Sequence, residues 1–239
     1  MNIITFETLD STNTYAKKNI DDLTDRTIIS TNIQTNGYGR FDRSWVDLGT
    51  ENIYMTFVLK PSEQLSQVHA NLTQYLSVCL CKHLDSLNLS PQIKWPNDVL
   101  LNGKKVCGIL AETIIRGGKL KGIVLGIGVN LNTSLESVDE IDRPATSVNL
   151  ELDQSINKQE FMEKLIGKFF ENYDEFLEKG FNFIREDYEK HAMFLNQNLK
   201  IAVFNIEKEG FSQGLDDNGN LIILNKDGEI EKINMGEIV

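Results

Sequence analysis

Residues 99–131 read VLLNGKKVCGILAETIIRGGKLKGIVLGIGVNL, an apolar run interrupted by two glycine-bearing turns. The Asn102-Gly103 pair favours a tight hairpin, because both central residues of a type I′ turn need a positive φ. Arg116-Gly117-Gly118 marks the second turn. The segment therefore predicts a meander of antiparallel strands at 99–101, 106–115 and 120–131, with Lys104 and Lys105 at the start of the returning strand.

Other strands are predicted before this meander. Segments rich in β-branched and aromatic residues predict strands at 2–6, 27–33, 52–59 and 92–95. With the meander, these strands favour a mixed or antiparallel sheet.

Helices are predicted at three places. The polar turn Asp10-Ser11-Thr12-Asn13 is suited to cap a helix running through Lys18. Pro61-Ser62 predicts the start of a long helix reaching about Leu87. Apolar residues at helical spacing predict another long helix from Asn157 to about Lys190. The chain is therefore expected to be an α+β protein.

The C-terminal segment, beyond Leu195, has a different residue pattern from the rest of the chain. Short alternating strands are predicted at 200–205, 210–215, 221–224 and 230–233, and they are joined by turns rich in Asp, Asn and Gly. This pattern is typical of a small β-barrel. The sequence thus predicts a larger domain over residues 1–194 and a barrel domain over residues 195–239.

Composition excludes several classes of protein. A net charge of -11 and a pI near 4.8 argue against general affinity for nucleic acid. The N-terminal segment lacks the pattern of a signal peptide, and no window approaches the roughly 18 apolar residues of a membrane span. Cys79, Cys81 and Cys107 lack metal-ligand spacing to histidines, so a reduced, cytoplasmic protein is expected.

The segment from Gln34 to Trp45 predicts an anion site. Gly37 and Gly39 let the backbone turn tightly, and Arg40 and Arg43 carry guanidinium groups that match carboxylates and phosphates. Taken alone, the segment is more typical of a glycine-rich surface turn with solvated arginines than of an anion site.

Two further segments carry polar residues at strand ends. Lys94-Trp95-Pro96-Asn97-Asp98 forms a corner, and Lys105 follows the hairpin; residues 91–122 hold six basic and two acidic residues in an acidic chain. This local excess is what an anionic ligand requires. Gly126-Ile127-Gly128-Val129-Asn130 combines glycines that allow close approach with an amide suited to reading a purine. Each segment alone is also typical of an ordinary strand and turn.

In this order, the segments resemble the signatures of the biotin–protein ligase family. The family has a Ser-Thr-Asn segment, a glycine- and arginine-rich loop, a Lys-Trp-Pro-Asn-Asp corner, a lysine before Gly-Ile-Leu, and Gly-x-Gly-x-Asn. They are found here at Ser11–Asn13, Gln34–Trp45, Lys94–Asp98, Lys105–Leu110 and Gly126–Asn130. The resemblance implies a mixed sheet like that of class II aminoacyl-tRNA synthetases, flanked by helices, with an SH3-like C-terminal barrel.

The resemblance also implies an activity. The family uses ATP to form biotinyl-5′-AMP, with Mg²⁺ shielding the phosphates, and transfers biotin to a lysine of a biotin carboxyl carrier protein. Arg40, Lys105 and Asp98 would be the catalytic residues. The biotin site would comprise Ser11, Thr12, Asn13, Gln34, Tyr38, Gly39, Arg40, Lys105 and Gly108. The adenylate site would comprise Arg40, Arg43, Trp45, Lys94, Asn97, Lys105 and Asn130, with residues 143–147 closing over the adenine. The resemblance leaves the metal ligands open.

Other implications concern partners. Some family members carry an N-terminal helix-turn-helix domain, but this chain begins almost at Ser11, so no such domain and no specific DNA binding are expected. A homodimer through a sheet edge is left open. Tyr38 stands where the family usually has an arginine, and Asp42 where it has a small residue; both bear on how the intermediate is retained.

Two rival functions remain at this stage. A lipoate or octanoate transferase shares the broader fold, although the Lys94–Asp98 corner and the arginine-bearing loop favour biotin. A non-catalytic biotin or nucleotide sensor would have no need for Arg40, Arg43 and Lys105 together. His69, His83 and His191 fall outside every motif and are assigned surface or packing roles.

Overall fold

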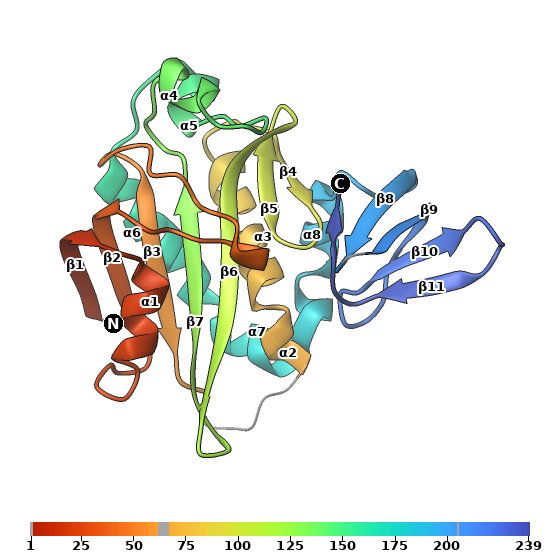
Figure 1. Ribbon diagram of the computed structural model, residues 1–239, viewed down its shortest axis with the longest axis horizontal. Coiled ribbons are helices and arrows are strands. Elements are labelled where there is room, and N and C mark those ends of the chain that lie inside the picture. The colour runs from red at the N-terminus through yellow and green to blue at the C-terminus, as the bar shows by residue number, and fades with distance from the viewer. Residues whose placement is uncertain (1, 62–66, 205) are drawn as a thin grey trace.

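The computed structural model describes residues 2–61, 67–204 and 206–239, without the side chains of residues 42 and 67. Within them the chain forms a large sheet and a smaller C-terminal sheet beside it (Figure 1). Among these residues, no helix has the length and apolar character that a membrane crossing requires.

The large sheet is mixed, as the sequence predicts. Its seven described strands lie in the order β1-β2-β3-β7-β6-β5-β4. β1 and β2 pair in parallel, and all the other neighbours pair antiparallel. The strands are β1 (Asn2–Leu9), β2 (Thr27–Gln34), β3 (Ile53–Leu59), β4 (Pro91–Lys94), β5 (Asp98–Leu101), β6 (Lys104–Arg116) and β7 (Lys119–Val129).

The predicted hairpin joins β5 to β6. Asn102 and Gly103 have φ values of 50° and 75°, as a type I′ turn requires. Lys104 pairs with Leu101 and opens the returning strand. The second predicted turn, at Gly117 and Gly118, joins β6 to β7.

The two faces of the large sheet are covered differently. On the front face in Figure 1, α1 (Thr12–Lys18) packs over β3 and β7. Its N-terminus is capped by Ser11, whose Oγ accepts a hydrogen bond from the Thr14 amide at 3.3 Å. On the back face, α3 (Leu72–Asp85) and α6 (Lys158–Glu171) enclose the main hydrophobic core.

Neither long predicted helix is continuous. The first is divided into α2 (Gln67–Ala70) and α3 at Asn71, whose side chain instead donates to Gln74 Oε1 and to the Asn218 carbonyl. Its predicted start at Ser62 lies outside the described residues.

The second predicted helix turns back on itself, so that each part buries its own aromatic residues. Gly180 permits one reversal because its φ is +65°. The segments are α6, α7 (Tyr173–Lys179), a 3₁₀ turn η2 (Gly180–Phe183) and α8 (Arg185–His191). Short helices α4 (Leu135–Asp139) and α5 (Val148–Leu152) were not predicted, nor was a 3₁₀ turn η1 (Arg40–Asp42).

The C-terminal sheet is antiparallel, and its five described strands lie in the order β11-β10-β9-β8-β12. The four predicted strands are present, with an additional two-residue strand β12. The strands are β8 (Asn198–Val203), β9 (Ile206–Leu215), β10 (Leu221–Asn225), β11 (Ile230–Ile233) and β12 (Glu237–Ile238).

The two sheets share one core. Leu199, Ile201 and Leu221 of the small sheet belong to the same buried cluster as Trp95 and Phe181. At the junction, the indole N–H of Trp95 donates to the Gly219 carbonyl at 3.2 Å. The small sheet is therefore packed firmly against the larger part of the chain.

Candidate active site

A cavity of about 740 Å³ lies on the front face of the large sheet, beside α1. Its floor is formed by glycines of β6 and β7, where Gly108 pairs with Gly128. Its walls come from the start of α1, from residues 34–46, from the β4–β5 corner, from residues 141–145 and from the last residues of the chain. Segments distant in the sequence thus meet at one site.

Neutral polar groups line one end of the cavity. Gln34 Oε1 accepts hydrogen bonds from the Thr12 amide at 3.0 Å and from its hydroxyl at 3.3 Å. Thr56 Oγ1 lies 2.8 Å from Thr12 Oγ1 and 2.7 Å from Asn13 Oδ1. Ser11, Thr12 and Gln34 are buried, so this end presents fixed donors and acceptors without net charge.

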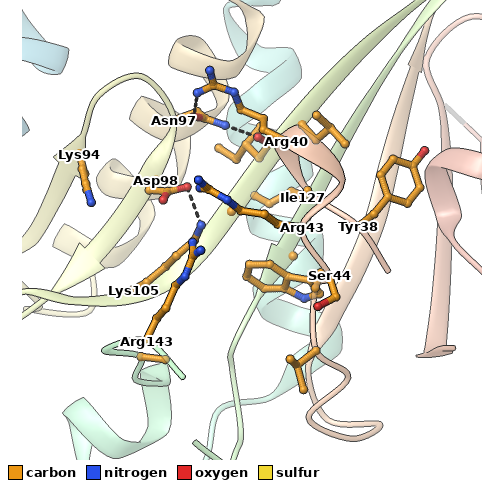
Figure 2. A pocket seen from close by; sticks show the side chains of 18 of the residues that line it. Tyr38, Arg40, Arg43, Ser44, Lys94, Asn97, Asp98, Lys105, Ile127 and Arg143 are labelled. Carbon is orange, nitrogen blue, oxygen red and sulfur yellow. Dashed lines mark hydrogen bonds and ion pairs between the residues drawn. The ribbon is translucent and has the colours of Figure 1, made fainter. Parts of the chain in front are cut away.

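Positive charge gathers at the other end. The lining includes the cations Arg40, Arg43, Lys94, Lys105 and Arg143 against the carboxylates of Asp98, Asp142 and Glu237. Figure 2 shows Arg40 and Arg43 extending into this region from one loop, Lys105 from β6 and Arg143 from a third segment, with Tyr38 on the other side of the loop. A locally positive cavity in a chain of net charge -11 is suited to an anionic ligand.

Lys105 is held at the centre of these charges. Its Nζ lies 2.7 Å from Asp98 Oδ1, in an ion pair between side chains that are 34% and 30% exposed. Its backbone amide donates to the Pro144 carbonyl, and its own carbonyl accepts from the Thr146 amide, both at 2.9 Å. These contacts hold the backbone of Lys105, and the ion pair directs its ammonium group toward Asp98.

Arg40 reaches from the loop to two other segments. Its guanidinium donates to Asn97 Oδ1 at 3.4 Å and to the Gly236 carbonyl at 2.8 Å. Burial lowers the pKa of Arg40 from its ordinary value, against the opposing effects of Glu237 and Asp98. The side chain remains a cation at neutral pH, because an arginine pKa starts above 12.

Arg43 forms a two-pronged ion pair with Glu237 of β12. Burial alone would raise the pKa of Glu237, but hydrogen bonds from Arg43 together with the positive charges of Arg43, Arg40 and Lys94 lower that pKa below its ordinary value. The Glu237 carboxylate is therefore the partner of an Arg43 guanidinium that lines the cavity.

Trp45 packs flat against the glycine floor. A Cβ at Gly128 would lie 2.5 Å from the Trp45 ring, and one at Gly108 would lie 2.8 Å from it. The glycines are thus required by close approach, as expected for glycine within strands. The indole N–H of Trp45 is buried against this floor and has no acceptor among the described residues.

Comparisons with known proteins match both parts of the chain. The sequence model of the biotin/lipoate A/B protein ligase family matches residues 5–130, and that of the biotin protein ligase C-terminal domain matches residues 194–239. The chain is 34% identical over 223 residues to the biotin–[acetyl-CoA-carboxylase] ligase of Paracoccus denitrificans, with 90% of each chain covered. The chain belongs to the biotin protein ligase family.

Other biotin protein ligases support the same assignment. The bifunctional ligase/repressor BirA of Bacillus spizizenii is 29% identical over 214 residues, and the chain spans 65% of that relative's length. The solved structure of the Aquifex aeolicus biotin protein ligase in complex with biotin and ATP has a TM-score of 0.83 at 28% identity, covering 100% of this chain and 97% of that one. The predicted fold class is confirmed.

Every predicted site residue of this biotin protein ligase family member lines the cavity. These are Ser11, Thr12, Asn13, Gln34, Tyr38, Gly39, Arg40, Arg43, Trp45, Lys94, Asn97, Asp98, Lys105, Gly108 and Asn130. Their individual roles remain predictions. Of the segment predicted to close over adenine, Arg143, Pro144 and Ala145 also line the cavity. Asn130 Nδ2 donates to the Thr146 carbonyl at 3.0 Å and ties this segment to β7.

The prediction that the basic residues of segment 91–122 gather at the ligand site was only partly correct. Of the basic residues in 91–122, Lys94 and Lys105 line the cavity. Arg116 and Lys121 instead pair with Asp21 near the β6–β7 turn, at the other end of the sheet. The remaining cavity cations come from Arg40, Arg43 and Arg143.

Sequence reasoning missed several residues that hold the site together. Glu112 contacts α1 and the loop, Asp47 Oδ2 accepts from the Gln34 amide at 2.8 Å, and Glu237 binds Arg43. Glu112 was detectable, because residues 108, 110 and 112 share a strand face and a carboxylate there needs partners. Glu237 has no comparable signal, because it lies in the two-residue strand β12, which the sequence did not predict.

The buried cysteines and histidines play no part in the cavity lining. Burial raises the pKa of Cys79 to about 12 and those of Cys81 and Cys107 well above their ordinary value. These thiols are therefore not nucleophiles at neutral pH. His69, His83 and His191 are buried, so of the predicted surface or packing roles, packing is the correct one.

Proposed function

We propose that this member of the biotin protein ligase family activates biotin with ATP and transfers it to a lysine of a biotin carboxyl carrier protein. The observation that carries the proposal is one continuous cavity with a neutral polar end and a cationic end. Biotin has the same division, with an uncharged ureido ring at one end and a carboxylate at the other.

The neutral end suits the ureido ring. Ser11, Thr12 and Gln34 supply donors and acceptors, and Asn13 supports the turn through its contact with Thr56. Tyr38 and Gly39 contribute loop backbone, and Gly108 belongs to the cavity floor beside Trp45. Buried polar groups of this kind strongly disfavour an acid that lacks the ureido group, such as lipoate.

The first step brings two anions together. An oxygen of the biotin carboxylate attacks the α-phosphorus of ATP, the bond to the β-phosphate oxygen breaks, and pyrophosphate leaves. Arg40 and Lys105 neutralise the charge at the reacting groups, and Asp98 keeps Lys105 in place through the 2.7 Å ion pair. Catalysis of this kind depends on alignment and preorganised positive charge.

Arg43 and the residues around it hold the nucleotide. Phosphate oxygens replace Glu237 as the partner of Arg43, an exchange that is accessible because this ion pair lies near the surface. Trp45 offers the adenine a flat ring. Lys94, Asn97 and Asn130 complete the nucleotide site.

In the second step, the amine of the carrier lysine attacks the carbonyl carbon of biotinyl-5′-AMP. A C–N bond forms, the C–O bond to phosphate breaks, AMP leaves, and the nitrogen loses a proton. Asp98 is the carboxylate that orients the incoming amine.

Mg²⁺ fits the donors in the cavity. Among the described residues no group of three potential metal ligands is gathered. Mg²⁺ commonly uses one or two carboxylates together with substrate phosphates, and Asp98 and Asp142 provide carboxylates here. When bound, Mg²⁺ neutralises phosphate charge.

The proposal includes the setting of the reaction. It assigns residues 1–194 to the ligand-binding domain and residues 195–239 to the barrel domain, and it places the protein in the cytoplasm. A homodimer would form at β1, which is an edge strand of the large sheet.

The test uses purified protein, ATP, Mg²⁺ and a biotin carrier domain, with biotin or lipoate supplied separately. The intact mass of the carrier is expected to increase by one biotin, and to stay unchanged with lipoate, without ATP or without Mg²⁺. A gain with lipoate would contradict the proposal. Biotin binding without any gain would identify a sensor instead.

A further inference from the structure

Glu112 of β6 is the centre of a polar cluster beside the cavity. Its Oε2 accepts hydrogen bonds from the Tyr38 hydroxyl at 2.8 Å and from Asn13 Nδ2 at 2.9 Å. Its Oε1 accepts from Lys17 Nζ at 2.6 Å. One carboxylate therefore joins β6, α1 and the loop of residues 35–46, which we term the arginine loop.

The cluster has a favourable charge arrangement. The side chains of Lys17 and Glu112 are 33% and 26% exposed, so water screens their ion pair less than it would screen a surface pair. Burial alone would lower the pKa of Lys17, but hydrogen bonds to Glu112 and Tyr38 raise it overall. Lys17 Nζ also lies 5.2 Å from the centroid of the Tyr38 ring. Lys17 thus contacts both partners of the Tyr38–Glu112 hydrogen bond.

Within the arginine loop, Tyr38 is tied to the residues that carry the guanidinium groups. Tyr38 and Ser44 form a β-bridge, the Gly39 amide donates to the Arg43 carbonyl at 2.7 Å, and the Trp45 amide donates to the Gly37 carbonyl at 2.9 Å. The loop is therefore a closed hairpin, and fixing Tyr38 on the sheet also fixes the backbone of Arg40 and Arg43.

The same cluster continues into the neutral end of the cavity. Asn13, which donates to Glu112, accepts a hydrogen bond from Thr56 at 2.7 Å, and Thr56 also lies 2.8 Å from the Thr12 hydroxyl. Loss of the Glu112 carboxylate would leave Asn13 and Lys17 without this partner.

We propose that Glu112 is a positioning residue that docks the arginine loop on the sheet before ligand binds. This inference rests on the proposed function: with the loop docked, biotin enters a preformed site and the acyl-adenylate leaves slowly. Glu112 acts through Tyr38 and Asn13 and touches none of the reacting atoms. Its loss therefore affects binding and retention more than the chemical step, as expected for a loop that covers a site.

The experiment compares Glu112→Ala and Glu112→Gln with the control Glu209→Gln. Glu209 lies on β9, is not part of the cavity lining, and forms an exposed ion pair with Lys200 at 3.3 Å. Pyrophosphate release in the presence of saturating carrier domain, which consumes the adenylate, gives KM for biotin and kcat. Protein loaded with labelled biotin and ATP, then chased with unlabelled biotin, gives the release rate of the adenylate.

For Glu112→Ala we expect adenylate release and KM for biotin each to rise about tenfold, with kcat within about twofold of the parent, a split that marks lost ground-state positioning. Glu112→Gln is expected to be intermediate, because its amide oxygen still accepts from Tyr38. Glu209→Gln is expected to match the parent. A lower kcat with unchanged KM and release rate would overturn the inference.

A second readout needs neither ligand nor activity. Trypsin cleaves after arginine, and cleavage at Arg40 and Arg43 in the unliganded protein requires the loop to leave the sheet. Faster cleavage is expected for Glu112→Ala and also for Tyr38→Phe, which removes one hydroxyl and serves if the alanine variant does not fold. Equal cleavage of parent and folded variants would refute docking by Glu112. A parent that docks the loop but makes no adenylate would contradict the proposed function instead.

Discussion

The front and back faces of the large sheet differ in the side chains they carry and in the role of those side chains. The back face is dry and aromatic: Phe169 is fully buried, with its ring centroid 4.4 Å from that of Phe57 and 5.1 Å from that of Tyr75. The front face carries glycines, paired charges and a buried indole N–H without an acceptor among the described residues. The back face therefore supplies stability, while the front face keeps space and polar groups free for ligands.

The largest effect is expected from a change on the back face. Phe169→Ala should lower the free energy of unfolding by about 4 kcal/mol, because a large buried ring leaves a cavity. Urea unfolding measures the loss. Phe41→Ala is the matched control, since Phe41 is 47% exposed on the arginine loop and should change stability by less than about 0.5 kcal/mol. Equal losses for both variants would remove the contrast between the faces.

The next effect is expected on the front face and in activity alone. Lys105→Ala should reduce the rate of adenylate formation about 100-fold, which corresponds to an increase of about 2.7 kcal/mol in the activation free energy. The variant lacks the positive charge that neutralises the reacting anions. Pyrophosphate release measures the rate. Lys104→Ala, the exposed neighbour on β6, is expected to retain activity. Activity of Lys105→Ala within a few-fold of the parent would show that the assigned role is wrong.

A third effect is pH-dependent and belongs to the back face. His83 is 2% exposed beside Phe161, and its ring nitrogens have no partner among the described residues. Burial, with smaller contributions from Lys168 and Lys164, lowers the pKa of His83 to about 4 against an ordinary value of 6.5.

The sign follows from proton uptake. Between pH 6.5 and about 4 the unfolded chain binds a proton at His83 that the native protein does not, so stability falls as pH falls through this window. The loss is on the order of 2 kcal/mol. Urea unfolding from pH 7 to pH 4 should show a smaller decline for His83→Phe than for the parent. Parallel declines would contradict this account.

The smallest effect is expected at the Arg43–Glu237 ion pair. Glu237→Gln removes the carboxylate that competes with phosphate for Arg43, and exposed pairs are worth at most about 1 kcal/mol. We expect KM for ATP to fall about threefold, as measured by pyrophosphate release at varied ATP. An unchanged or higher KM would show that Glu237 does not compete with ATP.

Local signals predicted most of the fold. The Asn102-Gly103 turn was found because its backbone geometry is specified by adjacent residues. The prediction of two continuous long helices was wrong at Asn71 and at Gly180, because such breaks depend on contacts with other parts of the structure. Asn71, for example, donates to the carbonyl of Asn218, which lies far away in the sequence. The hydrophobic periodicity of the sequence continues through such a break and therefore does not reveal it.

The site divides in the same way. Residues within contiguous motifs, such as Lys105 and Arg40, were predicted and line the cavity. Residues that orient them were missed when the contact joins distant segments, as with Glu237 and Arg43. Motifs thus identify the groups that meet a ligand, whereas the contacts that hold those groups emerge from tertiary structure.

The hydrophobic cluster shared by the two sheets has a consequence for thermal melting. Leu199, Ile201 and Leu221 lose their apolar surroundings if the small sheet separates, and Trp95 and Phe181 then become exposed to water. Unfolding of either sheet alone would therefore expose apolar side chains of the other sheet to water. Calorimetry is therefore expected to record one cooperative heat-absorption peak for the whole chain rather than separate peaks for its two sheets.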